Sequence, residues 1–124
     1  MHREKFNHVL KSVADVFRVL SHPDRIRLVG LLHQQEMDVT ELHEKVGISQ
    51  SSVSQHLKLL KMNHLVEERR EGRHVYYHLK NPDIIQVVMV AIELQAADHQ
   101  QEGKQVALYK EMHALWATDY DDAV

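Results

Sequence analysis

Apolar residues near the start of the chain recur at the spacing of a helix that packs along one face. The first run has i, i+3, i+4, i+7 spacing and consists of Phe6, Val9, Leu10, Val13, Val16, Phe17 and Leu20. Pro23 cannot continue that helix, but its fixed φ suits the first turn of another one. The pattern therefore predicts one helix that ends at Leu20 and a second that begins at Pro23 and ends near His33.

The next segment carries the signals of two short helices joined by a turn. Asp38 and Glu41 have the spacing of a capping box, which predicts the start of a short helix. Gly47 supplies a turn, and Ser49 is a good N-cap for a further helix over residues 50–62. Two short helices joined by a glycine turn are typical of a helix-turn-helix.

A β-hairpin is predicted after this unit, because residues 65–70 and 73–79 read as strands on either side of a turn at Glu71–Gly72. The second strand alternates between two sets, Val75, Tyr77 and Leu79 on one face and His74, Tyr76 and His78 on the other. This period of two indicates a half-buried hairpin.

The last third of the chain is again helical in pattern. Pro82 is expected to begin a long helix, and a further helix is expected beyond Gly103. The further helix has Val106, Tyr109, Met112 and Trp116 on one face, and residues 119–124 are expected to fray. The chain is thus predicted to be mainly α with one small β-hairpin, with a domain over 1–101 and a C-terminal helical extension over 102–124.

Composition and charge narrow the function. The 124 residues include no cysteine, so disulfide, thiolate-metal and thiol-redox chemistry are excluded. The net charge of −3 is uneven, with +1 over residues 1–39, +2 over 40–80 and −6 over 81–124. A modestly positive centre can neutralise phosphates despite the acidic total. No signal peptide or long apolar run is visible, so we expect a cytoplasmic protein without a membrane partner.

The predicted helix over 50–62 has one face suited to the major groove of DNA. Val53, Leu57 and Leu60 fall on the inward side, and Ser51, Ser54, Gln55 and Lys58 fall on the other. Gln pairs bidentately with adenine, Ser serves any base, and Lys meets phosphate or guanine. The alternative is an ordinary solvated helix face.

Three arginines, Arg69, Arg70 and Arg73, surround the predicted hairpin turn, and Tyr76 lies on its exposed face. Such a tip can lie along a sugar-phosphate backbone. The alternative is a solvated turn whose charges serve solubility. Their place directly after a helix-turn-helix favours contact with DNA.

Four segments together resemble the ArsR/SmtB family of bacterial winged-helix repressors. They are Leu20-Ser21-His22-Pro23-Asp24-Arg25-Ile26-Arg27-Leu28, Thr40-Glu41-Leu42, Gly47 to Leu60 and Arg70 to Leu79. The resemblance implies a winged helix-turn-helix homodimer paired through residues 6–20 and 83–101. It further implies recognition helices (50–62) in successive major grooves of a pseudo-palindromic operator in double-stranded DNA, with wings (66–79) on the flanking backbone. Repression would follow from binding, and an inducer would relieve it.

The DNA-contacting residues expected from the pattern and the resemblance are Gln50, Ser51, Ser54, Gln55, His56, Lys58, Arg69, Arg70, Arg73, His74 and Tyr76. One departure from the family pattern is His64, where glycine is often found at the end of the recognition helix. Asn63 beside it tolerates left-handed geometry, so this departure changes little in the expected fold.

Many family members sense metals at two places, and both look lost in this sequence. One site would fall on Asp38, Thr40 and His43, and the other on Asn81, Asp83, Leu94 and Ala97, sets that lack sulfur and most ligating groups. A displaced site for Ni²⁺ or Zn²⁺ stays open, with His8, Asp98, His99, Glu102 and His113 as candidate ligands.

Two other functional classes are less well supported. No Ser-His-Asp arrangement, phosphate loop or HExxH motif is present, so an enzyme is not expected. A winged-helix module that docks protein, with Tyr109 and Trp116 on its contact surface, has no need of three arginines at the hairpin tip. The effector is left open between a metal, an organic ligand, another protein and none.

Overall fold

A computed structural model describes residues 3–98 and 104–122, and within them the chain forms six helices and a two-stranded antiparallel sheet. The elements are α1 (Arg3–Leu20), α2 (Pro23–Gln34), α3 (Val39–Val46), α4 (Gln50–Met62), β1 (Val66–Glu71), β2 (His74–Leu79), α5 (Ile84–Asp98) and α6 (Lys104–Asp122). The predicted fold, mainly helical with one hairpin, is confirmed.

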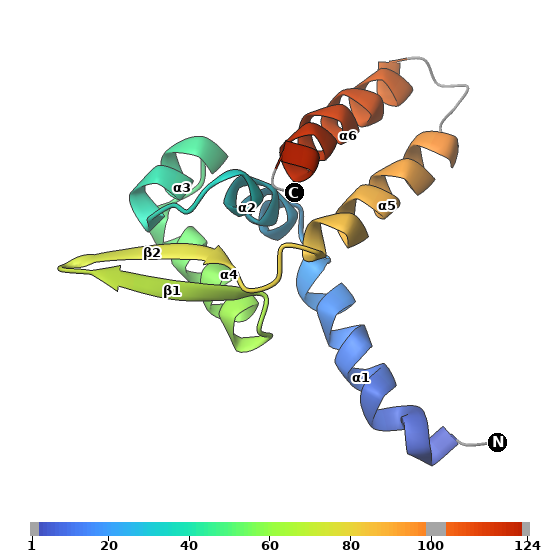
Figure 1. Ribbon diagram of the computed structural model, residues 1–124, viewed down its shortest axis with the longest axis horizontal. Helices are drawn as coiled ribbons and strands as arrows, with labels where there is room; N and C mark the ends of the chain where they lie inside the picture. Colours follow the sequence, from blue (N-terminus) through green and yellow to red (C-terminus); the bar gives the residue numbers. More distant parts are fainter. Residues whose placement is uncertain (1–2, 99–103, 123–124) are drawn as a thin grey trace.

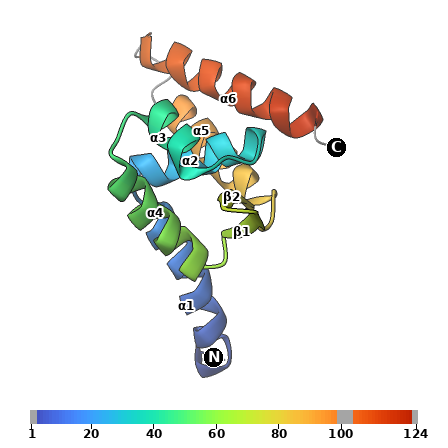
Figure 2. The same ribbon diagram turned by 90° about the vertical axis from the view of Figure 1, so that its left-hand side faces the viewer.

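The elements are arranged around α2 (Figures 1 and 2). The hairpin β1–β2 projects from one side of the molecule, and the N-terminal part of α1 extends away from the rest. Helices α5 and α6 pack side by side, and α6 lies across α2 from α4. The arrangement leaves α4, the hairpin and most of α1 at the surface.

One apolar core joins the helix-turn-helix to α2. Val53, Leu57 and Leu60 of α4 are at most 1% exposed, as the predicted inward face requires. They belong to the same buried cluster as Leu28 and Val29 of α2. Full burial of one such side chain is worth about 1.5–3 kcal/mol, so the apolar stripe fixes which face of α4 remains outside.

The cap residues behave as the sequence indicates. The Asp38 carboxylate accepts a hydrogen bond from the Glu41 amide at 2.8 Å, and the Glu41 carboxylate accepts one from the Asp38 amide at 3.4 Å. Gly47 ends α3 with φ +79°, and the Ser49 hydroxyl accepts from the Ser52 amide at 3.1 Å. The turn between α3 and α4 is therefore set by local chemistry.

Helix α6 docks on α2 through its one tryptophan. Trp116 is 7% exposed, and a Cβ atom added to Gly30 of α2 would overlap its ring. Tyr109 is partly buried and packs against the core, whereas Met112 is 45% exposed. The helix continues to Asp122, residues 123 and 124 lie outside the described residues, and fraying of residues 119–124 stays a prediction.

Two predicted boundaries shift by one or two residues. The hairpin turn is Gly72–Arg73, because Glu71 pairs with His74 in the ladder and Gly72 takes φ +61°, which suits a two-residue turn. Helix α5 begins at Ile84 and not at Pro82, which lies in a preceding turn where the Asn81 side chain accepts from the Asp83 amide at 3.0 Å.

The left-handed residue at the end of α4 is His64, the position at which the family pattern often has glycine. His64 has φ +61°, whereas Asn63 has φ −99°. The His64 amide donates to Lys61 at 3.0 Å and the Leu65 amide to Leu60 at 2.9 Å, the two hydrogen bonds of a Schellman motif. Because Leu60 and Leu65 are both buried, the motif and the core together hold a histidine in a conformation that favours glycine.

Candidate DNA-binding surface

The outward face of α4 is polar, exposed and without carboxylates. Gln50, Ser51, Ser54, Gln55 and Lys58 are all exposed. In the part of the chain described, Ser51 makes one long hydroxyl contact with Ser49, at 3.3 Å, and the other four have no hydrogen bond or ion pair within the protein. Their donors and acceptors are therefore available to a partner, as the sequence predicts.

His56 is turned away from this face toward α2. It is only partly exposed, its ring lies 4.5 Å from that of His22, and its Nδ1 is 3.3 Å from Arg25 Nη1. Burial lowers the pKa of His56 below its usual value, and the charges of His22 and Arg25 lower it further while Asp24 opposes them. The structure thus gives this predicted DNA contact partners inside the protein.

Arg69 of β1 already has partners inside the protein. Its Nη2 lies 2.6 Å from Glu36 Oε1 and its Nη1 lies 3.0 Å from Glu71 Oε2. Its guanidinium also sits over the Tyr76 ring, 4.9 Å from the centroid. Hydrogen bonds to Glu36 and Glu71 raise the pKa of Arg69, and the same contact lowers the pKa of Glu36. The guanidinium of Arg69 therefore already has two carboxylate partners within the protein.

The rest of the hairpin tip is more accessible. The Arg70 side chain is 76% exposed, and its Nη2 is 3.8 Å from Glu68 Oε2. Arg73 and His74 are exposed, and Arg73 has no partner among the described residues. The His74 ring lies 6.0 Å from the partly buried Tyr76 ring. Arg73 and Arg70 are consequently the wing charges most available to a phosphate.

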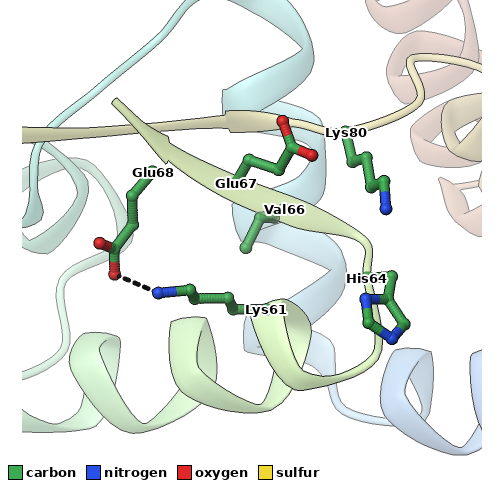
Figure 3. A pocket seen from close by; sticks show the side chains of 6 residues that line it. All are labelled: Lys61, His64, Val66, Glu67, Glu68 and Lys80. Carbon is green, nitrogen blue, oxygen red and sulfur yellow. Dashed lines mark hydrogen bonds and ion pairs between the residues drawn. The ribbon is translucent and has the colours of Figure 1, made fainter. Parts of the chain in front are cut away.

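A depression of about 500 Å³ lies between the end of α4 and the hairpin (Figure 3). Two lysines and two glutamates line it, and Lys61 Nζ is 2.9 Å from Glu68 Oε1. That hydrogen bond to Lys61 is the main cause of the lowered pKa of Glu68. The two lysines and two glutamates balance in formal charge, and the Lys61–Glu68 ion pair joins the end of α4 to β1.

Of the candidate ligands for a displaced metal site, only His8, Asp98 and His113 fall within the described residues. Asp98 is exposed at the end of α5 and His8 is exposed on α1, while His99 and Glu102 lie outside the described residues. His113 Nε2 is 2.6 Å from Glu93 Oε1, so this histidine already has a carboxylate partner.

The described residues include one other group of metal-ligating type. His22, Asp24 and His56 offer ligand atoms within 4.8 Å of one another. His22 Nδ1 accepts from the Asp24 amide at 3.1 Å, and His56 Nδ1 faces the Arg25 guanidinium. A neutral ring that accepts at Nδ1 carries its proton on Nε2 and has no lone pair there. A cation would have to displace both contacts beside a positive charge, so this group does not fit a metal ion.

A separate apolar surface covers α1 and one side of α5. Its exposed members are Phe6, Val9, Leu10, Val13 and Phe17 on α1 and Val87, Val90 and Leu94 on α5. Figures 1 and 2 show that the N-terminal part of α1 stands clear of the other elements. A surface of this kind marks an interaction site, and it falls in the two segments expected to pair in a dimer.

The order of α3, a glycine turn, α4 and a hairpin beside it defines a winged helix-turn-helix protein, a class that places its second helix in the major groove of DNA. Among the described helices, none combines the length and apolar character needed to cross a bilayer. The comparisons with known proteins agree with this class.

The model of the family "Bacterial regulatory protein, arsR family" matches residues 22–68. The HTH-type transcriptional regulator KmtR of Mycobacterium tuberculosis is 42% identical over 80 residues, which are 64% of this chain and 62% of KmtR. A biofilm growth-associated repressor of Xylella fastidiosa is 34% identical over 101 residues, 82% of this chain and 89% of the repressor.

A solution structure from Mycobacterium bovis has the same fold. It is a homodimeric winged helix-turn-helix DNA-binding domain of a possible ArsR-family regulator. It is 28% identical, with a TM-score of 0.67, and the match covers 84% of this chain and 94% of that chain. The chain belongs to the arsR family of bacterial regulatory proteins, a family of transcriptional regulators and not of enzymes.

One element of the site was not assigned from the sequence. Ser21-His22-Pro23-Asp24-Arg25 was interpreted as the boundary between two helices and as part of the family resemblance, but its His22 and Arg25 side chains reach α4. The clue available in the sequence was a histidine at an N-cap position followed by an arginine three residues later. Nothing local indicated that both would meet His56.

Proposed function

We propose that this protein is a homodimeric, sequence-specific DNA-binding repressor, with α4 in the major groove and the β1–β2 wing on the flanking backbone. The observation that carries the proposal is the exposed face of α4, where amide, hydroxyl and ammonium groups lie without carboxylates. Gln55 and Ser54 are proposed to contact bases, with Gln50, Ser51 and Lys58 at their side.

Phosphate contacts are proposed for the wing. Arg73 and Arg70 project from its tip, and His74 and Tyr76 lie on the same hairpin. Groups of this kind fix the register of a protein on the duplex without reading sequence. His56 and Arg69, whose side chains have partners inside the protein, are assigned supporting positions in this proposal.

Pairing through α1 and α5 is proposed to build the functional unit. The exposed apolar residues on these helices support it, and so does the homodimeric relative from Mycobacterium bovis. Two-fold symmetry in the protein calls for a pseudo-palindromic operator with half-sites about one helical turn apart. The residues beyond 101 are proposed to extend this unit, and a DNA partner implies a cytoplasmic location.

Selection of bound sequences from a random DNA library tests the proposal. We expect an enriched imperfect palindrome, bound with an affinity that falls steeply as salt rises, because phosphate contacts release counterions. Enrichment of no palindrome, together with a flat salt response, would refute DNA recognition. Retention of a protein partner under the same conditions would then favour a docking module.

A second candidate keeps the same DNA-binding unit and adds response to Ni²⁺ or Zn²⁺. The observation that favours it is the contact between His113 of α6 and Glu93 of α5. Asp98, another candidate ligand, lies on α5 together with Glu93. The proposed ligands come from His113, Asp98, His99, Glu102 and His8 of the two subunits. Metal analysis of untagged protein, followed by operator titration with each ion, decides it: no bound metal and no change in affinity removes the candidate.

A further inference from the structure

Three elements of the molecule meet at one side chain. The Arg25 Nε–H donates to the backbone carbonyl of Val19 at the end of α1, and Arg25 Nη1 lies 3.3 Å from Nδ1 of His56 in α4. Arg25 itself is partly buried in the first turns of α2. One guanidinium therefore bridges a helix of the proposed dimer surface and the recognition helix.

The bridge depends on the shape of arginine. Its planar fork presents separate N–H groups in fixed directions, whereas lysine offers a single ammonium on a flexible stem. A lysine at this position can meet the Val19 carbonyl or His56, but it has no rigid geometry that serves both. The requirement is therefore for arginine and not for positive charge alone.

His22 completes the contact from the side of α2. Its Nδ1 accepts the Asp24 amide at 3.1 Å as the N-cap of α2, and its ring lies 4.5 Å from that of His56 with a 53° tilt. The recognition helix is thus held by a tilted ring contact and a guanidinium, both supplied by residues 22–25. Apolar packing alone leaves a helix freer to slide along its axis.

We propose that Arg25 is a positioning residue for DNA recognition, which together with His22 and His56 fixes α4 relative to the α1 dimer helix. The inference rests on the proposed function, because it concerns the placement of two recognition helices on one operator. A shift of α4 relative to α1 changes the spacing between the two half-sites that the dimer can meet. It leaves the phosphate contacts of the wing in place.

Protonation gives this arrangement a pH dependence. The titratable and charged groups that face His56 among the described residues are His22, Asp24 and Arg25, all at the start of α2. A proton on His56 Nδ1 removes its acceptor and places a cation beside Arg25. Burial, and after it the charges of His22 and Arg25, hold the pKa of His56 below that of an unfolded histidine, about 6.5, and Asp24 opposes them. The neutral state thus stabilises the fold above about pH 6.5, and this contribution is lost as pH falls through the lowered pKa.

The experiment compares Arg25→Lys with Arg27→Lys, a matched change at an exposed neighbour. A palindrome selected with the wild-type protein is the specific probe, and a random duplex of the same length is the reference. We expect Arg25→Lys to reduce the ratio of specific to random affinity about five- to tenfold at pH 7.5, with random affinity and dimerisation unchanged. Arg27→Lys should leave the ratio as in wild type.

A second variant provides a readout that a purely structural role would not move. In His56→Asn the side-chain oxygen takes the place of Nδ1 as an acceptor, but it does not titrate. We expect the wild-type ratio to fall as pH is lowered below about 6.5, and the His56→Asn ratio to stay nearly level over the same range.

Two results would overturn the inference while leaving the proposed function intact. One is an equal loss of specific and random affinity in Arg25→Lys, and the other is the same pH profile for His56→Asn and wild type. If the wild-type protein itself prefers no palindrome at pH 7.5, the proposed function fails instead.

Discussion

Helix α4 and the wing expose different chemistry, although both are expected to face DNA. The outward residues of α4 have almost no partners inside the protein, whereas Arg69 of the wing binds two carboxylates and Arg70 lies near a third. A donor or acceptor without a partner inside the protein can bind DNA without first breaking an existing hydrogen bond. We therefore expect α4 to discriminate between DNA sequences and the wing to add a modest, sequence-independent attraction.

The largest expected effect is on the α4 side. Gln55→Ala should cost about 1–3 kcal/mol per half-site on the selected operator, roughly a 5- to 150-fold loss, because a bidentate base contact disappears. Affinity for random DNA should change little. Fluorescence anisotropy with both duplexes measures this, with Gln34→Ala at the exposed end of α2 as control. An equal loss on both duplexes would break the comparison.

Removal of the free wing charge should have a smaller and different effect. Arg73→Ala is expected to weaken operator and random DNA by the same factor, up to about fivefold per wing, as befits one exposed charge pair. The slope of log affinity against log salt should fall by about one per lost phosphate contact. Lys110→Ala on α6 removes the same charge at a distance and serves as control. A loss confined to the operator would contradict the assignment.

His64 lies at the junction between α4 and the wing, and its left-handed backbone can be tested by substitution with glycine. His64→Gly should stabilise the protein by up to about 1 kcal/mol, because glycine adopts φ +61° without the penalty that histidine meets. Thermal unfolding measures the shift as a rise of a few degrees. Asn63→Gly is the matched control and should destabilise, since its φ of −99° is ordinary and its side chain donates to Leu59 at 2.8 Å. A lower melting temperature for His64→Gly would show that the left-handed backbone carries no penalty.

The smallest expected effect comes from release of Arg69. Glu36→Gln removes the carboxylate 2.6 Å from its Nη2, so the freed guanidinium can meet a phosphate. Random-DNA affinity should rise by about twofold at most. Glu111→Gln on α6 corrects for the change in net charge. An equal rise in both variants would mean that total charge, and not the release of Arg69, is responsible.

Local sequence patterns predicted most of the helices, the hairpin and the buried face of α4. The capping box at Asp38 and Glu41 and the buried stripe Val53, Leu57 and Leu60 were predicted because their signals lie within one or two helical turns. The pairing of Arg69 with Glu36 was not predicted, because 33 residues separate them and nothing in the sequence distinguishes Glu36 from other acidic residues as the partner of Arg69. The contact of Arg25 with His56 was missed for the same reason.

Single-residue conformations were also beyond the patterns. Asparagine adopts the left-handed conformation more readily than histidine does, but the hydrogen bonds to Leu60 and Lys61 place that conformation at His64 and not at Asn63. Tertiary fit decided the outcome, because Leu65 must reach the core.

The uneven charge has a consequence for how quickly the protein finds DNA. Residues 40–80 carry +2 and residues 81–124 carry −6, and α6 lies across α2 from the recognition helix. Such a separation is an electric dipole. In a two-fold dimer the components across the axis cancel and those along it add. Near a negatively charged duplex the resulting torque turns the acidic helices outward during approach, which raises the fraction of encounters that are productive. The acidic end of the chain thereby acts on the association rate, and its influence weakens as salt shortens the screening length.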